Sequence, residues 1–277
     1  EPSTGEVLCL VSSPTYDPSL MIGRDRGKNH LAMSKDPWKP LLNRAIMGAY
    51  PPGSTFKTTQ ALTFLQEGII NTGTMYPCSG GFSYRGLHVG CHAHPSPLSL
   101  IPAIATSCNG YFCWGLYYMI GARQKYGSVQ KAMNTWRDYM VSMGFGYQLG
   151  IDLPGEKRGM IPNAQYYDKA YRRSWNGLTI ISISIGQGEV TATPLQIANL
   201  GATIANRGYF VTPHVVKEIE GESIDSIYTT RRYTKVDKGH YEEVVQGMRS
   251  AVLGGTCRTA NIPELEICGK TGTAQNH

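Results

Sequence analysis

The chain has 277 residues, of which 41% are hydrophobic and 17% charged, and its formal net charge is +6. This composition excludes a disordered chain and a coiled coil, so we expect one large domain, or two small ones, with a hydrophobic core. The modest basic excess contains no lysine or arginine run, which argues against a nucleic-acid surface but suits a nearby anionic polymer. No apolar stretch approaches the ~20 residues of a membrane-spanning helix.

The predicted elements alternate with long loops. An apolar run at 7–11 predicts a buried strand, and residues 12–43 are loop-like because proline and glycine recur through them. A Pro-Pro-Gly turn then leads into a predicted helix over residues 54–66. Further helices are predicted over residues 100–105, 111–120, 129–143, 195–206 and 241–253. A last strand at 266–268 leads into a Lys-Thr-Gly triplet, and this mixture predicts an α/β domain without a βαβ series.

Ser54 and Lys57 form an S-x-x-K motif at the start of the first predicted helix. Residues three apart lie on one helical face, so the lysine amine can reach the serine hydroxyl. A serine becomes a strong nucleophile when a neighbouring base takes its proton. A lysine can be that base only if burial and a second nearby cation lower its pKa from about 10.4. We therefore interpret Ser54 as a nucleophile and Lys57 as its base.

Context separates this motif from chance matches. Ser128 begins a second S-x-x-K, which we interpret as a helix surface, and a second S-x-N at 174–176 lies in a loop-rich stretch. Ser54 follows Pro-Pro-Gly, which fixes the backbone and removes bulk beside the nucleophile. It is followed in chain order by Ser-Cys-Asn at 107–109 and by Lys-Thr-Gly at 270–272.

Each of the later motifs supplies groups that an acyl transfer needs. Ser107 can relay a proton to a leaving amine, and Asn109 can hold a substrate amide. Lys270 supplies a second cation that would lower the pKa of Lys57 and attract a carboxylate. The residues expected to bind substrate through the backbone are Thr271, Gly272 and Thr273. The amides of the nucleophilic serine and of the last of these threonines would form an oxyanion hole.

The three motifs in this order resemble those of the penicillin-binding proteins and serine β-lactamases. Flanking sequences narrow the resemblance to the transpeptidase domain of class B penicillin-binding proteins. Those sequences are residues 4–8, 12–18 and 43–57. Two more, GIDLPGE at 150–156 and SIGQGE at 184–189 followed by TPLQ, are similar to the penicillin-binding protein 2 branch, which acts in cell elongation.

The resemblance covers nearly the whole chain and implies an α/β (α+β) fold. A central antiparallel sheet would be flanked by helices, with an additional helical subdomain. Residues 1–277 would be the transpeptidase domain, truncated at its C-terminus, because relatives continue past the Lys-Thr-Gly strand and cover what is here an exposed edge. The family's membrane anchor and N-terminal non-catalytic domain would also be missing, and the resemblance implies the periplasmic face of the bacterial inner membrane.

The resemblance implies a serine-type D-Ala-D-Ala transpeptidase or carboxypeptidase that cross-links peptidoglycan stem peptides. β-Lactams would form slowly released acyl-enzymes on Ser54. The implied partners are a membrane glycosyltransferase and shape-determining proteins, with no nucleic acid. The alternatives are a β-lactamase, a β-lactam-binding sensor and a non-catalytic scaffold. A β-lactamase needs a residue that activates a deacylating water, and the sequence offers no clear candidate.

A cysteine–histidine segment precedes and enters the S-x-N motif. Cys78, Cys91, His94 and Cys108 follow the spacing C-x12-C-x2-H-x13-C. Three thiolates and an imidazole form a normal tetrahedral zinc set, so one interpretation is a structural zinc that steadies the active site. The alternatives are a Cys78–Cys91 disulfide, favoured by an oxidising compartment, and free buried thiols. No cofactor is expected for catalysis itself.

Overall fold

The computed structural model describes residues 1–273, and helices supply most of its regular structure. The α-helices are α1 (Arg26–Lys35), α2 (Arg44–Met47), α3 (Lys57–Gln66), α4 (Leu100–Ala105), α5 (Asn109–Gly121), α6 (Arg123–Tyr126), α7 (Val129–Ser142), α8 (Ala164–Ala170), α9 (Pro194–Ala205) and α10 (Lys238–Gly254). The 3-10 helices are η1 (Pro18–Met21), η2 (Gly53–Phe56), η3 (Ile181–Ile185), η4 (Ser226–Tyr228) and η5 (Arg258–Ala260). The strands are β1 (Gly81–Tyr84), β2 (Leu87–Gly90), β3 (Tyr209–Val211) and β4 (Arg231–Tyr233).

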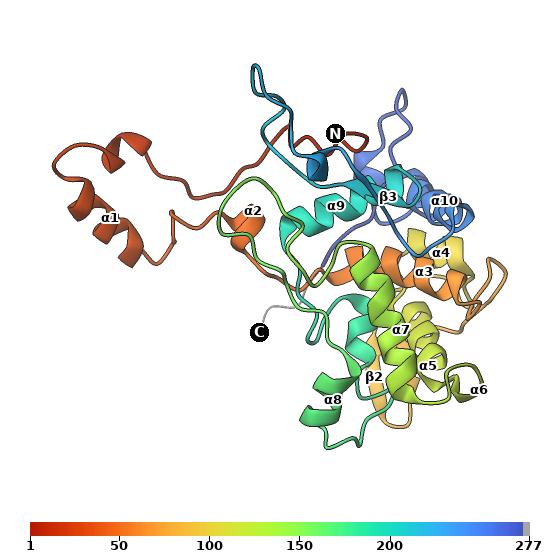
Figure 1. The fold of residues 1–277 in the computed structure, drawn as a ribbon. Coiled ribbons are helices and arrows are strands. Elements are labelled where there is room, and N and C mark those ends of the chain that lie inside the picture. The colour runs from red at the N-terminus through yellow and green to blue at the C-terminus, as the bar shows by residue number, and fades with distance from the viewer. Residues whose placement is uncertain (274–277) are drawn as a thin grey trace.

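Helix α3 forms the centre of the core. Figure 1 shows it between α4 and α10 on one side and α5 and α7 on the other. All of its residues except Gln66 are buried, as is typical of a helix that is covered on every side. Phe56, just before α3, makes edge-to-face contacts with Trp136 of α7 and with Phe145. The helix that begins at Lys57 therefore starts inside the hydrophobic core.

The longer helices follow the sequence predictions closely. Helix α9 begins at the N-cap Thr193, whose side chain and that of Gln196 form a reciprocal capping box, and Pro194 occupies the first turn. The second S-x-x-K motif is structural, because Ser128 Oγ accepts the Lys131 amide at the N-terminus of α7. Among the described residues, no helix combines the length and apolar composition needed to cross a bilayer.

The central antiparallel sheet implied by the resemblance is not formed by residues 1–273. The strands instead make two separate antiparallel hairpins, β1 with β2 and β3 with β4. The predicted strand at 7–11 is exposed, with Leu8 at 77%, and only the neighbouring Glu6 forms a bridge, to His214. The predicted strand at 266–268 is also not formed. A strand needs neighbours for its backbone groups, and beside the 7–11 segment the described residues offer one bridge, at which the Val7 amide donates to the His214 carbonyl oxygen, but no paired strand.

Residues 12–43, predicted as a loop, contain the helix α1. Figure 1 shows this part of the chain extending away from the body of the molecule. No residue of α1 is buried, and the exposed side chain of Trp38 follows it. Proline and glycine spacing indicated the turns on either side of this helix, but its few apolar residues gave no helical pattern.

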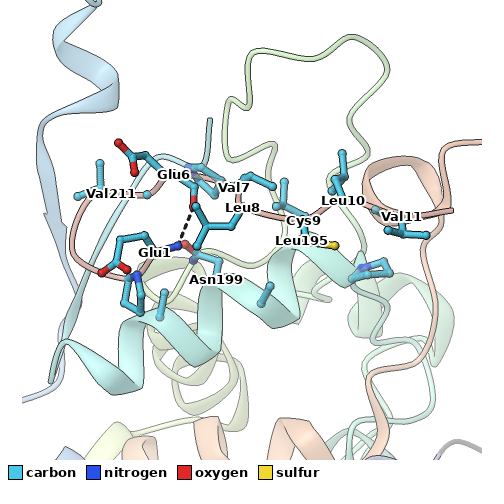
Figure 2. Close-up of a pocket in the computed structure, with 17 residues that line it drawn as sticks. Glu1, Glu6, Val7, Leu8, Cys9, Leu10, Val11, Leu195, Asn199 and Val211 are labelled. Carbon is cyan, nitrogen blue, oxygen red and sulfur yellow. Dashed lines mark hydrogen bonds between the residues drawn. The ribbon is translucent and has the colours of Figure 1, made fainter. Parts of the chain in front are cut away.

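An apolar groove separates the N-terminal segment from α9. Figure 2 shows residues 1–11 passing over this helix, with Val7 and Leu10 on one side and Leu195 on the other. The groove has a volume of about 400 Å³. No residue of the three sequence motifs lines it, so it is distinct from the candidate active site.

Candidate active site

The turn that carries Ser54 is held by the SIGQGE segment. Ser54 lies in η2, which runs directly into α3. The Gly53 amide donates to the Gly186 carbonyl oxygen at 2.8 Å. Gly186 has a φ of +70°, and a Cβ there would lie 2.2 Å from the Gly53 carbonyl oxygen. Glycine is therefore required at 186 by both its conformation and its close approach to the turn that carries Ser54.

Lys57 is fully buried, and its amine is directed at the S-x-N motif. Its Nζ lies 2.6 Å from the Ser107 carbonyl oxygen, 3.2 Å from Ser107 Oγ and 2.6 Å from Asn109 Oδ1. These oxygens can use all three hydrogens of an ammonium group. Among the described residues no hydrogen bond joins Ser54 Oγ to Lys57 Nζ, although their spacing predicted such a contact. Catalytic hydrogen bonds of this kind often shorten only when substrate is bound.

Ser107 connects the S-x-N motif to the Lys-Thr-Gly motif. Lys270 Nζ donates to Ser107 Oγ at 2.7 Å and to the Thr271 carbonyl oxygen at 3.2 Å. Ser107 is buried and has a φ of +54°, a region that residues other than glycine adopt uncommonly. Strained backbone of this kind is often found at functional sites, where the surrounding structure holds it in place.

The two lysines have lowered pKa values. Burial lowers the pKa of Lys57 to about 8, and the neighbouring cysteines, when ionised, act in the opposite direction. Burial, followed by the charge of Lys57, lowers the pKa of Lys270 to about 7. The Lys-Thr-Gly motif predicted that Lys270 would lower the pKa of Lys57. The structure shows the reverse dependence, because burial alone accounts for the lowered pKa of Lys57.

The Lys-Thr-Gly segment passes beside the turn that carries Ser54. A Cβ at Gly272 would lie 3.0 Å from Thr55 Cγ2, so the glycine permits this approach. Thr271 Oγ1 donates to Thr256 Oγ1 at 3.0 Å, and the Gly269 amide donates to the carbonyl oxygen of Met248 in α10. Helix α10 therefore positions the Lys-Thr-Gly segment, which was predicted to be part of a sheet. Thr273 is the last described residue.

Sequence reasoning missed two of these supporting contacts. Thr256 belongs to no motif, so nothing in the sequence predicted its contact with Thr271. Gly186 lies in a segment that served only to narrow the family resemblance. The two glycines on either side of Gln187 were a signal available in principle, since glycine often marks a turn that needs a positive φ.

The four cysteine and histidine residues come together in one cluster. One ligand atom from each of Cys78, Cys91, His94 and Cys108 lies within 4.8 Å of all the others. Donors placed 2.0–2.3 Å from a tetrahedral zinc are separated by roughly 3.3–3.8 Å, so the cluster is close to the required size. His94 Nε2 lies 3.3 Å from Cys91 Sγ, and Nδ1 lies 2.7 Å from the Pro95 carbonyl oxygen. A second hydrogen bond of this type is usual for a metal-binding histidine.

The thiols of the cluster are not joined by disulfides. Cys78 and Cys91 are both free, as are the other cysteines, so the structure does not contain the alternative Cys78–Cys91 bond. Hydrogen bonds from the Cys108 thiol and the Asn109 amide lower the pKa of Cys91 to about 4, against the effect of burial. Burial raises the pKa of Cys78. This donor set, with a thiolate already favoured at one position, suits a thiophilic metal such as zinc.

Comparison with known proteins gives a match over the whole sequence. The family model described as penicillin binding protein transpeptidase domain matches residues 1–277. The peptidoglycan D,D-transpeptidase MrdA of Acinetobacter baumannii is 35% identical over 290 residues, which cover 99% of this chain and 40% of that protein. The chain therefore spans less than half the length of this relative.

Solved structures of related proteins have the same fold. A peptidoglycan synthase complex described as coordinating polymerization and crosslinking matches with a TM-score of 0.83 at 32% identity, over 100% of this chain and 45% of that one. Penicillin-binding protein 2 in complex with MreC from Helicobacter pylori matches with a TM-score of 0.79 at 27% identity, over 99% and 49%. The imipenem acyl-enzyme of penicillin-binding protein A from M. tuberculosis matches with a TM-score of 0.74 at 27% identity, over 99% and 61%.

Proposed function

This chain belongs to the penicillin-binding protein transpeptidase domain family, and we propose that residues 1–277 are the catalytic domain of a peptidoglycan D,D-transpeptidase of the penicillin-binding protein 2 type. The observation that carries the proposal is the arrangement around Ser107, whose hydroxyl receives hydrogen bonds from both Lys57 and Lys270 beside the Ser54 turn. The similarity to MrdA supports the choice of branch.

The acylation step uses Ser54 as nucleophile. Ser54 Oγ attacks the carbonyl carbon of the D-Ala–D-Ala peptide bond, and its proton passes to the neutral amine of Lys57. Ser107 then relays a proton to the leaving nitrogen as the C–N bond breaks, so that D-alanine departs and an ester remains on Ser54. A neighbouring stem amine attacks this ester, forms the cross-link and restores the serine hydroxyl.

The pKa of Lys57 suits this role. With a pKa of about 8, roughly a tenth of Lys57 is neutral at pH 7. An ordinary lysine would be neutral in less than about one molecule in a thousand at this pH. Burial of α3 therefore lowers the pKa of Lys57 enough for its neutral amine to act as the base. The oxygens of Ser107 and Asn109 hold this amine beside the turn that carries Ser54.

The remaining motif residues bind the substrate. Lys270 attracts the terminal carboxylate, whose charge favours the protonated form of this lysine. The backbone of Thr271 and Gly272 lies along the extended peptide. The Ser54 amide, at the start of a helix where amides have no partner within the helix, forms the oxyanion hole together with the Thr273 amide.

Covalent labelling with a penicillin tests this assignment. The wild type is expected to form an adduct at Ser54 that lasts for many minutes, and Ser54→Ala is expected to form none. Ser128→Ala, which alters the other S-x-x-K motif, is the matched control and should label normally. A wild type without any adduct would overturn the proposal, and rapid release of the adduct would identify a β-lactamase instead.

We propose in addition that Cys78, Cys91, His94 and Cys108 hold a structural zinc. The ion would supply a cross-link between the loop that carries Cys78 and Cys91 and the motif that contains Cys108, and it would take no part in the acyl transfer. Metal analysis of the purified protein is the test. We expect about one zinc per chain in the wild type and a large loss in Cys78→Ser. A wild type without bound metal would exclude the zinc site.

The same relatives support a proposal for the partners and location of the whole protein. A related structure contains a complex for polymerization and crosslinking, and another contains MreC. We propose that the protein works with a membrane glycosyltransferase and a shape-determining protein at the periplasmic face of the inner membrane. Co-purification of these two proteins with the full-length protein from solubilised membranes is expected, and its absence would contradict the proposal.

A further inference from the structure

Asn109 is held through both of its nitrogen atoms by the end of β2. Its side-chain Nδ2 donates to the Gly90 carbonyl oxygen at 2.7 Å, and its backbone amide donates to Cys91 Sγ at 3.3 Å. Its Oδ1 accepts from Lys57 Nζ at 2.6 Å. A carbonyl oxygen can only accept and an ammonium can only donate, so the carboxamide cannot rotate by half a turn without losing both contacts.

Cys91 is itself fixed by two further contacts. Its amide donates to the Gly80 carbonyl oxygen at 2.9 Å, which extends the pairing of the β1–β2 hairpin. Its Sγ lies 3.3 Å from His94 Nε2 within the cluster. The sulfur that accepts the Asn109 amide therefore has a defined position, set by the hairpin on one side and by the cluster on the other.

The other two cysteines of the cluster contact different groups. Cys108 Sγ accepts the Tyr111 amide and so caps the N-terminus of α5. Cys78 lies against Gly110, where an added Cβ would be 2.9 Å from its Sγ. Among the described residues, Cys91 is the member of the cluster whose ligand atom contacts Asn109.

We propose that Cys91 is a positioning residue for the acyl transfer, whose sulfur fixes the Asn109 amide and through it the direction of the Lys57 amine. The inference rests on the function proposed for Ser54 and Lys57. It goes beyond a structural role for the cluster, because it gives Cys91 a function that the other cysteines of the cluster do not have. Loss of any ligand weakens the cluster, but only loss of the Cys91 sulfur removes the acceptor of the Asn109 amide.

Hydrogen exchange at the Asn109 amide tests the contact directly. Cys91→Ala and Cys78→Ala each remove one thiol ligand, but only the first removes the acceptor of the Asn109 amide. We expect the amide to exchange roughly threefold to tenfold faster in Cys91→Ala than in Cys78→Ala, which corresponds to one net hydrogen bond. Equal exchange in the two variants would overturn the proposal.

The variant Cys91→Ser provides the conservative control. Its hydroxyl can accept a hydrogen bond but is a poor zinc ligand, so Cys91→Ser should resemble Cys91→Ala in metal content and exceed it in acylation rate. We expect the first-order acylation constant to fall roughly threefold to tenfold in Cys91→Ala and less in Cys91→Ser. Equal acylation by these two variants would argue for a merely structural role and against the proposal.

The comparison remains informative if the alanine variants do not fold. In that case Cys91→Ser is compared with Cys78→Ser. A serine hydroxyl at position 91 lies farther from the Asn109 amide than the cysteine sulfur does, because the C–O bond is shorter than the C–S bond. We therefore expect faster exchange of the Asn109 amide in Cys91→Ser than in Cys78→Ser. Failure of the proposed function appears separately, as a wild type that penicillin does not acylate. Exchange at Asn109 does not depend on that reaction, so either idea can fail alone.

Discussion

Lys57 and Lys270 donate to the same hydroxyl oxygen, that of Ser107, at distances of 3.2 and 2.7 Å from their Nζ atoms. Two ammonium groups that share one acceptor in a buried site repel each other, so the pair loses its first proton more readily than an isolated lysine does. The hydroxyl between them can accept from one amine and donate to the other when that amine is neutral. This arrangement provides a proton path between the two lysines.

The acylation rate should depend on pH with a defined sign. Only the neutral amine of Lys57 can take the proton of Ser54, and the pKa of Lys57 is lowered to about 8. We therefore expect the acylation constant to rise with pH, by nearly tenfold per unit well below the pKa, and to level off above about pH 8. Stopped-flow measurement with a chromogenic β-lactam gives this profile. A rate that is flat or falls between about pH 6 and pH 8 would contradict the role of Lys57.

Removal of the Lys57 amine should abolish most of the acylation. Lys57→Met keeps a long apolar side chain in the buried position but removes the base, and we expect a loss on the order of 10²–10⁴-fold in the acylation constant. Lys131→Met, in the second S-x-x-K motif, is the matched control and should have no effect. The same penicillin assay compares both variants, and equal losses in the two would reject the assignment of the base.

Gly186→Ala should destabilise the protein and slow acylation together. A Cβ at this position would lie 2.2 Å from the Gly53 carbonyl oxygen at a φ of +70°. We expect a loss of about 1–3 kcal/mol from the backbone conformation, with a displaced Ser54 turn. Gly201→Ala is the control, because nothing lies within 4 Å of a Cβ there and alanine favours a helix by about 0.5–1 kcal/mol. Denaturant unfolding measures both, and an unaffected Gly186→Ala would contradict this packing.

Gln196 is expected to contribute strongly to stability. It is fully buried, and its Nε2 donates to the carbonyl oxygens of Gly144, Tyr147 and Arg158. Gln196→Glu would place a carboxylate against these acceptors, at a cost of about 3 kcal/mol or more. The exposed Gln165→Glu should change the free energy of unfolding by less than about 0.5 kcal/mol. Similar values for the two variants would show that the three contacts do not stabilise this region.

The sequence predicted the longer helices of the core well, because they are recorded in local patterns, but it missed the exposed helix α1. Thr193 and Pro194 mark the start of α9, and the spacing of Ser54 and Lys57 marks a helical face. The family resemblance predicted that the three motifs form a single site. The roles of the individual motif residues remain predictions until the variants are measured.

Other features could not be predicted, because they depend on contacts distant in the chain. The predicted strand at 7–11 is not formed, because the described residues beside it supply one bridge, between Glu6 and His214, and no paired strand. The contact between the Asn109 amide and Cys91 Sγ joins residues 18 apart with no repeating pattern. The pKa of Lys57 is lowered by burial rather than by Lys270, and the extent of burial appears only when α3 is seen at the centre of the core.

The most direct test of the central claim is the reaction itself. The full-length protein is incubated with a peptidoglycan pentapeptide substrate that ends in D-Ala–D-Ala, and both D-alanine release and cross-linked dimers are measured. We predict equal formation of the two products by the wild type and neither product from Ser54→Ala. A wild type that is acylated by penicillin but releases no D-alanine would be a β-lactam sensor, and it would contradict the assignment as a transpeptidase.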